Sequence, residues 1–325
     1  MKSLLRISVA LALAWVGPFA AAQTKDAPYP SKPIRCVVPF PPGGTADIQA
    51  RMLFDKLVPR LGQQIVIDNR GGANGSIGME FAARSPADGY TIVLATVGTW
   101  VINPYLYKLS YEVLDFAPLI HVATTPGVLI VHPSLPVKSV KELIALARQR
   151  PGELTYGSAG IGGFGHMSAE LFSVMAKVKM SHVPYKGTGP ATTDLLGGHI
   201  QMLFNSAVPS VPHIKSGKVR ALATTGAQRM SILPELPTIA EAAVPGYENS
   251  TWTGIGAPPK TPRAITDRLN KELNAVLQLP EIQQSARNDG SVITGGTPED
   301  FRAILKSELA KFGKLVTAAG IKPES

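Results

Sequence analysis

Three glycine-rich segments hold the residue types in this sequence that are best suited to binding chemistry. They are residues 39–47 (PFPPGGTAD), 69–78 (NRGGANGSIG) and 156–166 (YGSAGIGGFGH), called here the first, second and third glycine segments. Each stands between a strand-like run and a helical one. Glycine lets a ligand approach the backbone, and the first N–H groups of the following helix have no partner within it. With the positive end of the helix dipole, these groups bind a carboxylate or phosphate without an arginine. One such segment alone could be a tight turn, but the three together predict an anion site.

The third glycine segment also matches a dinucleotide-binding fingerprint, G-x-G-x-x-G, through Gly160, Gly162 and Gly165. That fingerprint needs an acidic residue at the end of the next strand, where the residue binds a ribose. The next strand-like run, residues 180–186 (MSHVPYK), contains no carboxylate, and the first one after it is Asp194. We therefore predict no nicotinamide cofactor, and no cofactor of another kind.

Sequence patterns that would indicate an enzyme are missing. The chain has no G-x-S-x-G nucleophile elbow, and its six histidines are too far apart in the sequence to form a local zinc pair. Cys36 is the single cysteine, and because it lies in an apolar run we expect it to be inert core. The sequence predicts no catalytic residue and no metal. An exported hydrolase that uses Ser158 or His166 is the least favoured alternative.

The first 22 residues have the pattern of a cleaved signal peptide. Lys2 and Arg6 precede an apolar run over residues 7–19, and Ala20–Ala22 fits the small-residue rule for cleavage before Gln23. A membrane anchor is the alternative, but the run is shorter than the roughly 20 residues that span a bilayer. We expect cleavage after Ala22 and a soluble mature protein in the periplasm.

The chain is basic, with 32 Lys and Arg residues against 23 Asp and Glu and a formal net charge of +9. The basic residues are spread along the sequence, and no basic run alternates with aromatic residues as in a nucleic-acid groove. We predict a basic solvated surface with a mild attraction for small anions, and no nucleic-acid partner.

Short β-branched runs alternate with helical stretches along the chain, which is typical of an α/β protein with helices on both faces of a parallel sheet. The pattern predicts strands at residues 33–40, 64–68, 91–97, 128–131, 154–156, 180–184, 200–204 and 219–224. A helix is expected over residues 46–61, and Ser139 and Thr297 begin two further helices with capping boxes. Residues 122–127 and 221–226 are candidates for two passages between lobes.

Longer motifs cover most of the expected mature chain. They are VPFPPGGTAD with Arg51, VIDNRGGANGSIG, ADGYTIVLAT, NPYLY, YGSAGIGGFGH, HVPYKGTGP, LPTIAEA and TWTGIGAP. In these motifs the sequence resembles the periplasmic solute-binding proteins of tripartite tricarboxylate transporters, the Bug receptor family. The resemblance implies an α/β type II periplasmic binding protein fold, with two lobes of mixed, mostly parallel sheets joined by two crossover strands. With the passages above, residues 23–123 and 224–325 would form lobe 1, and residues 124–223 lobe 2.

The resemblance also implies a function without catalysis. A small mono- or dicarboxylate would lie between the lobes of a monomer for uptake, and the membrane subunits of a tripartite transporter would be the partners. A receptor that presents its ligand to a sensor kinase is the alternative within the same fold.

Site residues follow from the resemblance by position. One carboxylate would be held, partly through water, by Pro41, Gly43, Gly44, Thr45, Ser158, Gly160, Gly162, Gly163 and His166. Asp47 would complete this site without contacting the anion, since we expect its carboxylate in the first helical turn, where the helix dipole favours it and backbone donors face it. The rest of the pocket would be formed by Thr96, Gly98, Thr99, Asn205 and Trp252. For Asn205 a turn cap is the alternative, and for Trp252 a place in the core between the lobes. Family members often have an aspartate at the position of Asn205, so an amino-acid ligand is disfavoured here. They often have a hydroxyl residue at that of Gly163, so one side-chain hydrogen bond to the carboxylate would be missing here.

Overall fold

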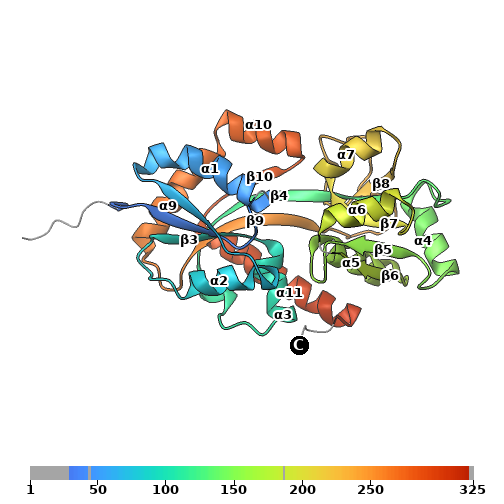
Figure 1. The fold of residues 1–325 in the computed structure, drawn as a ribbon, viewed down its shortest axis with the longest axis horizontal. Coiled ribbons are helices and arrows are strands. Elements are labelled where there is room, and N and C mark those ends of the chain that lie inside the picture. The colour runs from blue at the N-terminus through green and yellow to red at the C-terminus, as the bar shows by residue number, and fades with distance from the viewer. Residues whose placement is uncertain (1–28, 43–44, 186, 322–325) are drawn as a thin grey trace, which may run out of the picture.

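The computed structural model describes residues 29–42, 45–185 and 187–321, which fold into two α/β lobes that lie side by side (Figure 1). The predicted signal peptide, residues 1–22, lies outside this part of the chain. One sheet of ten strands runs through both lobes. The two-lobed α/β architecture with a mixed sheet is therefore as predicted.

Lobe 1 has parallel strands at its outer edge and antiparallel strands toward the middle of the molecule. Across the sheet these are β2 (Ile65–Asn69), β1 (Ile34–Val38), β3 (Thr91–Thr96), β9 (Ser250–Ala257) and β4 (Ala117–Val131), with β10 (Val292–Gly295) paired to β4. β1 is parallel to β2 and β3, whereas β9 is antiparallel to β3 and β4. The helices and turns are α1 (Thr45–Leu61), η1 (Ala73–Gly75), α2 (Ser76–Ala83), η2 (Gly98–Ile102), α3 (Asn103–Leu106), η3 (Val113–Asp115), α9 (Arg263–Leu277), α10 (Pro280–Asp289) and α11 (Pro298–Ala319).

Lobe 2 continues the sheet beyond β4. The next strands are β7 (Met202–Ser206), β5 (Thr155–Ser158) and β6 (Ser181–Pro184), and β8 (Arg220–Thr224) also pairs with β4. The helices are α4 (Val140–Gln149), α5 (Phe164–Ala176), α6 (Thr188–Leu196), α7 (Ala207–Lys215) and α8 (Ile239–Ala242). β5 is parallel to β6 and β7, and β4 is antiparallel to β7 and β8. The sheets were predicted to be mostly parallel, but more strand pairs are antiparallel than expected, because all pairings of β4 and β9 are antiparallel.

The strands β4 and β9 join the lobes (Figure 1). Residues 117–126 of β4 pair with β9, and residues 127–131 pair with β7 and β8. β9 returns the chain to lobe 1, and its first residue Ser250 lies opposite Pro126.

The return passage lies later in the sequence than residues 221–226. Ile239 and Tyr247 pack in the apolar core of lobe 2 with residues of α4 and α5, and Met230 packs with residues of α6. The N–H of Asn249 donates to the carbonyl oxygen of Thr225. Residues 225–249, which we expected in lobe 1, thus contact lobe 2. We propose that lobe 1 comprises residues 29–126 and 250–321, and lobe 2 residues 127–249.

Both faces of the sheet are buried around residues 36–38 of β1, which explains the apolar run there. Ile34, Cys36 and Val38 face a core shared with α1 and α9, whereas Val37 faces a second core shared with η2 and α11. Strand side chains alternate between faces, so consecutive positions are apolar where both faces are covered, and Arg35 is exposed near the start of the strand. Cys36 is fully buried, as predicted, and burial raises the pKa of its thiol.

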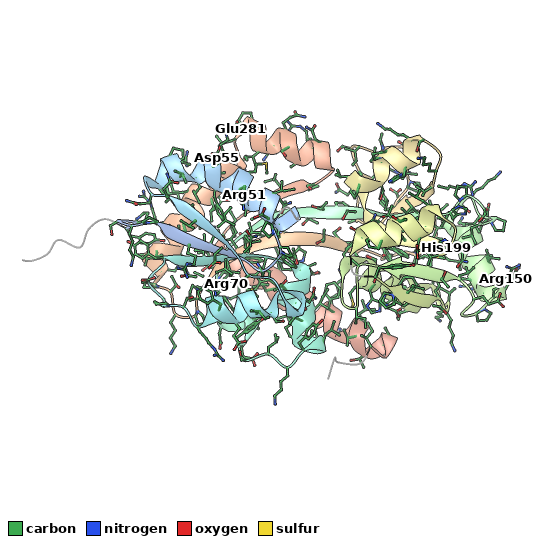
Figure 2. The ribbon with its side chains drawn as sticks, in the orientation of Figure 1. Arg51, Asp55, Arg70, Arg150, His199 and Glu281 are labelled. Carbon is green, nitrogen blue, oxygen red and sulfur yellow. The ribbon has the colours of Figure 1, made fainter. Side chains whose placement is uncertain are left out.

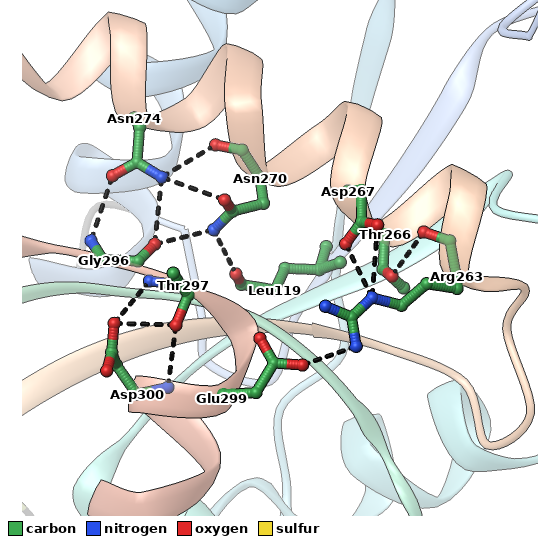
Figure 3. Close-up of polar contacts among 10 residues, drawn as sticks. All are labelled: Leu119, Arg263, Thr266, Asp267, Asn270, Asn274, Gly296, Thr297, Glu299 and Asp300. Atoms are coloured by element: carbon green, nitrogen blue, oxygen red, sulfur yellow. Dashed lines mark hydrogen bonds and ion pairs between the residues drawn. The ribbon is translucent and has the colours of Figure 1, made fainter.

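The last helix is fixed at its start by polar contacts to α9 and β4 (Figure 3). Thr297 Oγ1 accepts the N–H of Asp300 at 3.1 Å, and the Asp300 carboxylate accepts the N–H of Thr297 at 2.8 Å, which completes the predicted capping box. Asn270 Nδ2 donates to the carbonyl oxygens of Leu119 and Gly296, each at 2.8 Å. From this anchor α11 runs beneath lobe 1 toward lobe 2, where it packs against α5 (Figure 1).

Candidate functional site

The ends of β1, β2 and β3 bring the first and second glycine segments together on lobe 1. Gly75 precedes α2 with a φ of 89°, and a Cβ there would lie 3.0 Å from Thr99 Oγ1 and 3.2 Å from the Pro39 carbonyl oxygen. A Cβ on Gly71 would lie 3.4 Å from Pro41 Cδ. Glycine permits these approaches, so the two segments and the residues after β3 form one wall.

Amide side chains fix the backbone that leads into α2. Asn103 Nδ2 donates to the Asn74 carbonyl oxygen at 2.9 Å and to Ser76 Oγ at 3.0 Å, and Asn74 Nδ2 donates to Asn103 Oδ1 at 2.8 Å. Asn74 has a φ of 48°, a left-handed conformation that asparagine tolerates better than most residues. Sequence reasoning did not select Asn74 or Asn103, although Asn within a glycine-rich turn was a usable signal.

Asp47 lies in the first turn of α1, as expected, and its carboxylate has partners within lobe 1. Both carboxylate oxygens accept hydrogen bonds from Arg51 at 3.0 Å, and Asn69 Nδ2 donates to one of them at 3.1 Å. Arg51 projects from α1 (Figure 2). Asp47 is only 2% exposed, so we assign it the role of holding the first glycine segment rather than contacting an anion. Gly43 and Gly44 lie outside the described residues, and Thr45 is the first residue of α1.

On lobe 2, a cavity of about 60 Å³ lies where β5 and β7 end and where α5, α6 and α7 begin. Its polar lining comes from Ser158, Thr188, Asn205 and Ser206. The first N–H groups of three helices therefore converge on one cavity, together with the positive ends of their dipoles. Asn205 is buried and its Nδ2 donates to Ser210 Oγ at 3.3 Å, so its side chain also braces the start of α7.

Hydrogen bonds within the third glycine segment use the N–H groups of its glycines. Gly160 donates to Ser158 Oγ at 3.1 Å, Gly162 donates to His166 Nδ1 at 3.1 Å, and Gly163 donates to the Gly160 carbonyl oxygen at 3.3 Å. Gly160, Gly162 and Gly163 are predicted ligand contacts, and these hydrogen bonds shape the loop that holds them. The N–H groups at the start of α5 remain as the donors that a helix terminus supplies.

Ser158 has a second partner that sequence reasoning missed. Its Oγ lies 2.6 Å from His182 Nε2 and 3.0 Å from the Gly160 carbonyl oxygen. Burial lowers the pKa of His182 to about 4, which makes its ring a poor general base near neutral pH. The hydrolase alternative named Ser158 or His166, and the histidine at hydrogen-bond distance from Ser158 is His182. No local signal pointed to it, since His182 is 24 residues from Ser158.

The two walls meet at Gly162. A Cβ on this buried glycine would overlap Leu106 Cδ1 and lie 3.5 Å from Ile102 Cγ2, so the third glycine segment of lobe 2 packs directly on η2 and α3 of lobe 1. The φ of Gly162 is 75°. The second and third glycine segments thus approach the same part of lobe 1, next to the end of β3.

The remaining predicted pocket residues divide into two groups. Thr96 and Gly98 lie at the end of β3, where a Cβ on Gly98 would be 3.8 Å from Thr96 Oγ1 and from Asn74 Nδ2. Thr99 follows them, fully buried, and its Oγ1 has no hydrogen-bond partner within the described chain. These three residues belong to the wall of lobe 1.

Trp252 lies away from that wall. Its ring packs edge-to-face on His121 and Phe301, at centroid distances of 5.3 and 5.8 Å, and its Nε1 donates to Glu308 at 3.5 Å. Phe301 and Glu308 belong to α11. Trp252 therefore occupies the core beneath α11, which was the alternative to a pocket position, and we leave it out of the proposed site.

Comparison with known proteins agrees with this arrangement. The family model described as "Tripartite tricarboxylate transporter family receptor" matches residues 49–321. The chain belongs to this receptor family. It is 36% identical to the protein BugT of Bordetella pertussis over 318 residues, which cover 95% of this chain and 98% of BugT.

Solved structures extend the family likeness to the fold. The R. palustris protein Rpa4515, solved with adipate, is 41% identical, with a TM-score of 0.81, and the match covers 91% of this chain and all of that one. MatC of Rhodopseudomonas palustris, solved with bound malate, is 29% identical, with a TM-score of 0.77, and the match covers 89% of this chain and all of that one. The fold of this receptor is thus that of solute-binding proteins.

Among the described residues, no helix is long and apolar enough to cross a bilayer. No group of three or more His, Cys, Asp or Glu side chains there is placed to hold a metal ion. Figure 2 shows charged side chains on both lobes, with Arg51 and Arg70 on lobe 1 and Arg150 on lobe 2.

Proposed function

We propose that this receptor captures a small mono- or dicarboxylate between its lobes and delivers it for uptake. The observation that carries the proposal is that glycine segments of both lobes pack on the same part of lobe 1. Gly75, which precedes α2, lies against Thr99, and Gly162, which precedes α5, lies against Leu106, while Pro41 of the first glycine segment packs on Gly71. The first and third glycine segments contain neither Lys nor Arg. Helix N-termini bind carboxylates through N–H groups and the dipole, so this site requires no cation.

The similar proteins support the class of ligand. Structures of two family members contain adipate and malate, and both ligands are small dicarboxylates. In our proposal the carboxylate lies between residues 41–47 of lobe 1 and the start of α5 in lobe 2. Thr96, Thr99 and Asn205 would contact the rest of the ligand. Hydroxyl and amide groups at these positions accept or donate hydrogen bonds and add no charge.

The proposal extends to location and partners. Cleavage after Ala22 would release a monomer into the periplasm, where the membrane subunits of a tripartite transporter would receive the ligand. Presentation of the ligand to a sensor kinase is the second candidate. Copurification of the ligand-loaded protein with transporter membrane subunits, but not with a sensor kinase, would separate the two.

Isothermal titration calorimetry tests the binding claim. Residues 23–325 would be titrated with adipate, malate, an aromatic monocarboxylate and the amide of each acid. We expect at least one acid to bind saturably and its amide to bind far more weakly. Gly160→Ala should weaken binding, because the φ of Gly160 is 132° and a side chain there strains the loop. Gly217→Ala, at φ 69° with open space around it, is the matched control and should bind normally. Absence of binding across the acids would contradict the proposal.

A further inference from the structure

Three aromatic rings stack directly beneath the third glycine segment. The rings form three offset, nearly parallel pairs, with centroid distances of 4.9 Å for Tyr156–His182, 4.2 Å for His166–His182 and 6.4 Å for Tyr156–His166, and interplanar angles of 18°, 23° and 18°. Tyr156 on β5 and His182 on β6 are partners in the parallel register, and His166 comes from the first turn of α5. The stack thus ties two strands and a helix together at the base of the loop.

Both histidines of this stack are hydrogen-bonded to the third glycine segment, His166 directly to Gly162 and His182 to Ser158. His166 Nδ1 accepts the N–H of Gly162 at 3.1 Å, so this nitrogen carries no proton and the ring proton is on Nε2. Ser158 Oγ accepts the N–H of Gly160 at 3.1 Å and lies 3.0 Å from the Gly160 carbonyl oxygen. The Ser158 hydroxyl has one proton, and donating it to the Gly160 carbonyl oxygen leaves none for His182. His182 Nε2, 2.6 Å from Ser158 Oγ, must therefore be the donor of their hydrogen bond.

This pattern satisfies Ser158 Oγ, which accepts two hydrogen bonds and donates one, its full capacity. His182 Nε2 has no lone pair to take the Ser158 proton, so the pair is not a nucleophile with its base. His166 must be neutral for its Nδ1 to accept, and a neutral His182 carries its single proton on Nε2. Burial lowers the pKa of His182 to about 4, and burial together with the nearby His182 lowers that of His166 to about 3.

The rest of the stack is held in the same way. Tyr156 donates its hydroxyl proton to Glu170 of α5, and burial raises the pKa of that carboxyl group. Tyr156 is fully buried, so its ring has a fixed place on which His182 packs. The loop conformation is therefore determined by side chains that are largely buried, with Tyr156, Ser158 and His166 at most 5% exposed.

We propose that His182 and His166 are positioning residues for carboxylate binding: His182 fixes Ser158 and Gly160, His166 fixes Gly162, and the loop so held directs the first N–H groups of α5 at the ligand. The inference rests on the proposed function and adds a role for His182, a residue that does not contact the ligand in the proposed site. A hydrogen bond is worth about 0.5–1.5 kcal/mol, so loss of the His182 donor corresponds to a roughly two- to tenfold weaker affinity.

Variants at His182 separate the hydrogen bond from the packing. His182→Phe keeps an aromatic ring in the stack but removes the donor, and His182→Gln places an amide N–H near the position of Nε2. We expect His182→Phe to bind adipate two- to tenfold more weakly and His182→Gln to recover most of the loss. His199→Phe is the control, because His199 is an exposed histidine of lobe 2 outside the network (Figure 2). It should bind adipate like the unsubstituted protein.

A measurement without ligand tests the network itself. In ¹⁵N NMR of the histidine side chains at pH 7, His166 and His182 should both carry the proton on Nε2, and His182→Phe should speed amide hydrogen exchange at Gly160. An Nδ1–H tautomer for either ring would overturn the inference. Equal adipate affinity and equal exchange in His182→Phe would overturn it too. If the unsubstituted protein binds none of the carboxylates, the proposed function fails, and the tautomers and the exchange still decide whether these histidines hold the loop.

Discussion

Gly162→Ala is the substitution that most sharply tests the contact between the lobes. The φ of Gly162 is 75°, and a left-handed conformation costs a residue with a Cβ about 1–2 kcal/mol. The added methyl group would also overlap Leu106 Cδ1, and overpacking of this kind costs about 1–3 kcal/mol. The sum predicts a loss of about 2–5 kcal/mol in the free energy of unfolding.

A matched glycine separates the two contributions. Gly152 has a φ of 81° and open space where its Cβ would be, so Gly152→Ala carries the backbone cost alone. The expected difference between the two variants is therefore the overlap with Leu106, about 1–3 kcal/mol. Urea denaturation of the mature protein, followed by circular dichroism, measures both losses.

The double variant Leu106→Ala/Gly162→Ala tests whether Leu106 is the side chain that the added methyl group overlaps. In a Leu106→Ala background the overlap disappears, so Gly162→Ala should cost only about as much as Gly152→Ala, and the double-mutant cycle should show a coupling of about 1–3 kcal/mol. Equal losses for Gly162→Ala and Gly152→Ala, together with a cycle that closes without coupling, would refute the packing of the third glycine segment on α3.

Three further predictions concern single side chains. Asp47→Asn should lower the free energy of unfolding by about 1–2 kcal/mol, because it removes the charge that pairs with Arg51 at the start of α1; an unchanged urea midpoint would contradict this. Burial lowers the pKa of His121 to about 4, so the unfolded chain takes up this proton first, near pH 6.5. The stability that depends on neutral His121 should be full above that pH and fall by up to about 3 kcal/mol as the pH drops toward 4. His166 and His182 add losses of their own, so His121→Leu should reduce the total fall in thermal melts without abolishing it; parallel pH profiles would be the opposing result. Gly254→Ala should lower the free energy of unfolding by about 1–3 kcal/mol, because the added methyl group would overlap the Phe301 ring. An unchanged melting temperature in calorimetry would contradict this.

Local patterns in the sequence predicted most of the secondary structure. The helix expected over residues 46–61 and the capped starts at Ser139 and Thr297 agree with α1, α4 and α11. These elements carry their own signals, namely apolar periodicity and caps that act within one turn.

Strand β9 had no such signal, and the reason lies in its partners. Gly254 and Gly256 weaken the strand pattern of STWTGIGA, yet each admits a ring from elsewhere: Phe301 packs on Gly254, and Trp100 lies 2.7 Å from where a Cβ of Gly256 would be. The return of the chain to lobe 1 was consequently placed near residue 224. Glycine is required at these two positions by rings that are distant in the sequence, and a local sequence pattern contains no information about such contacts.

The site itself was predictable where it depends on helix starts. The glycine segments identified the walls of both lobes, and Thr188 and Ser206 could have been found by the same reasoning, because they also begin or precede helices. His182 could not, since its role depends on the register that places β6 beside β5. The internal hydrogen bonds of Gly160 and Gly162 use Ser158 and His166 of the same segment, and the pairing of these particular residues follows from the folded loop rather than from a local pattern.

A crystal structure of the mature protein with the carboxylate that binds best in calorimetry tests the central claim most directly. The account predicts a carboxylate group between the lobes, with an oxygen about 3 Å from the N–H groups at the start of α5 and the opposite side facing residues 41–47. A carboxylate held by lysine or arginine side chains on the surface, or bound within one lobe without contact to the other, would contradict it.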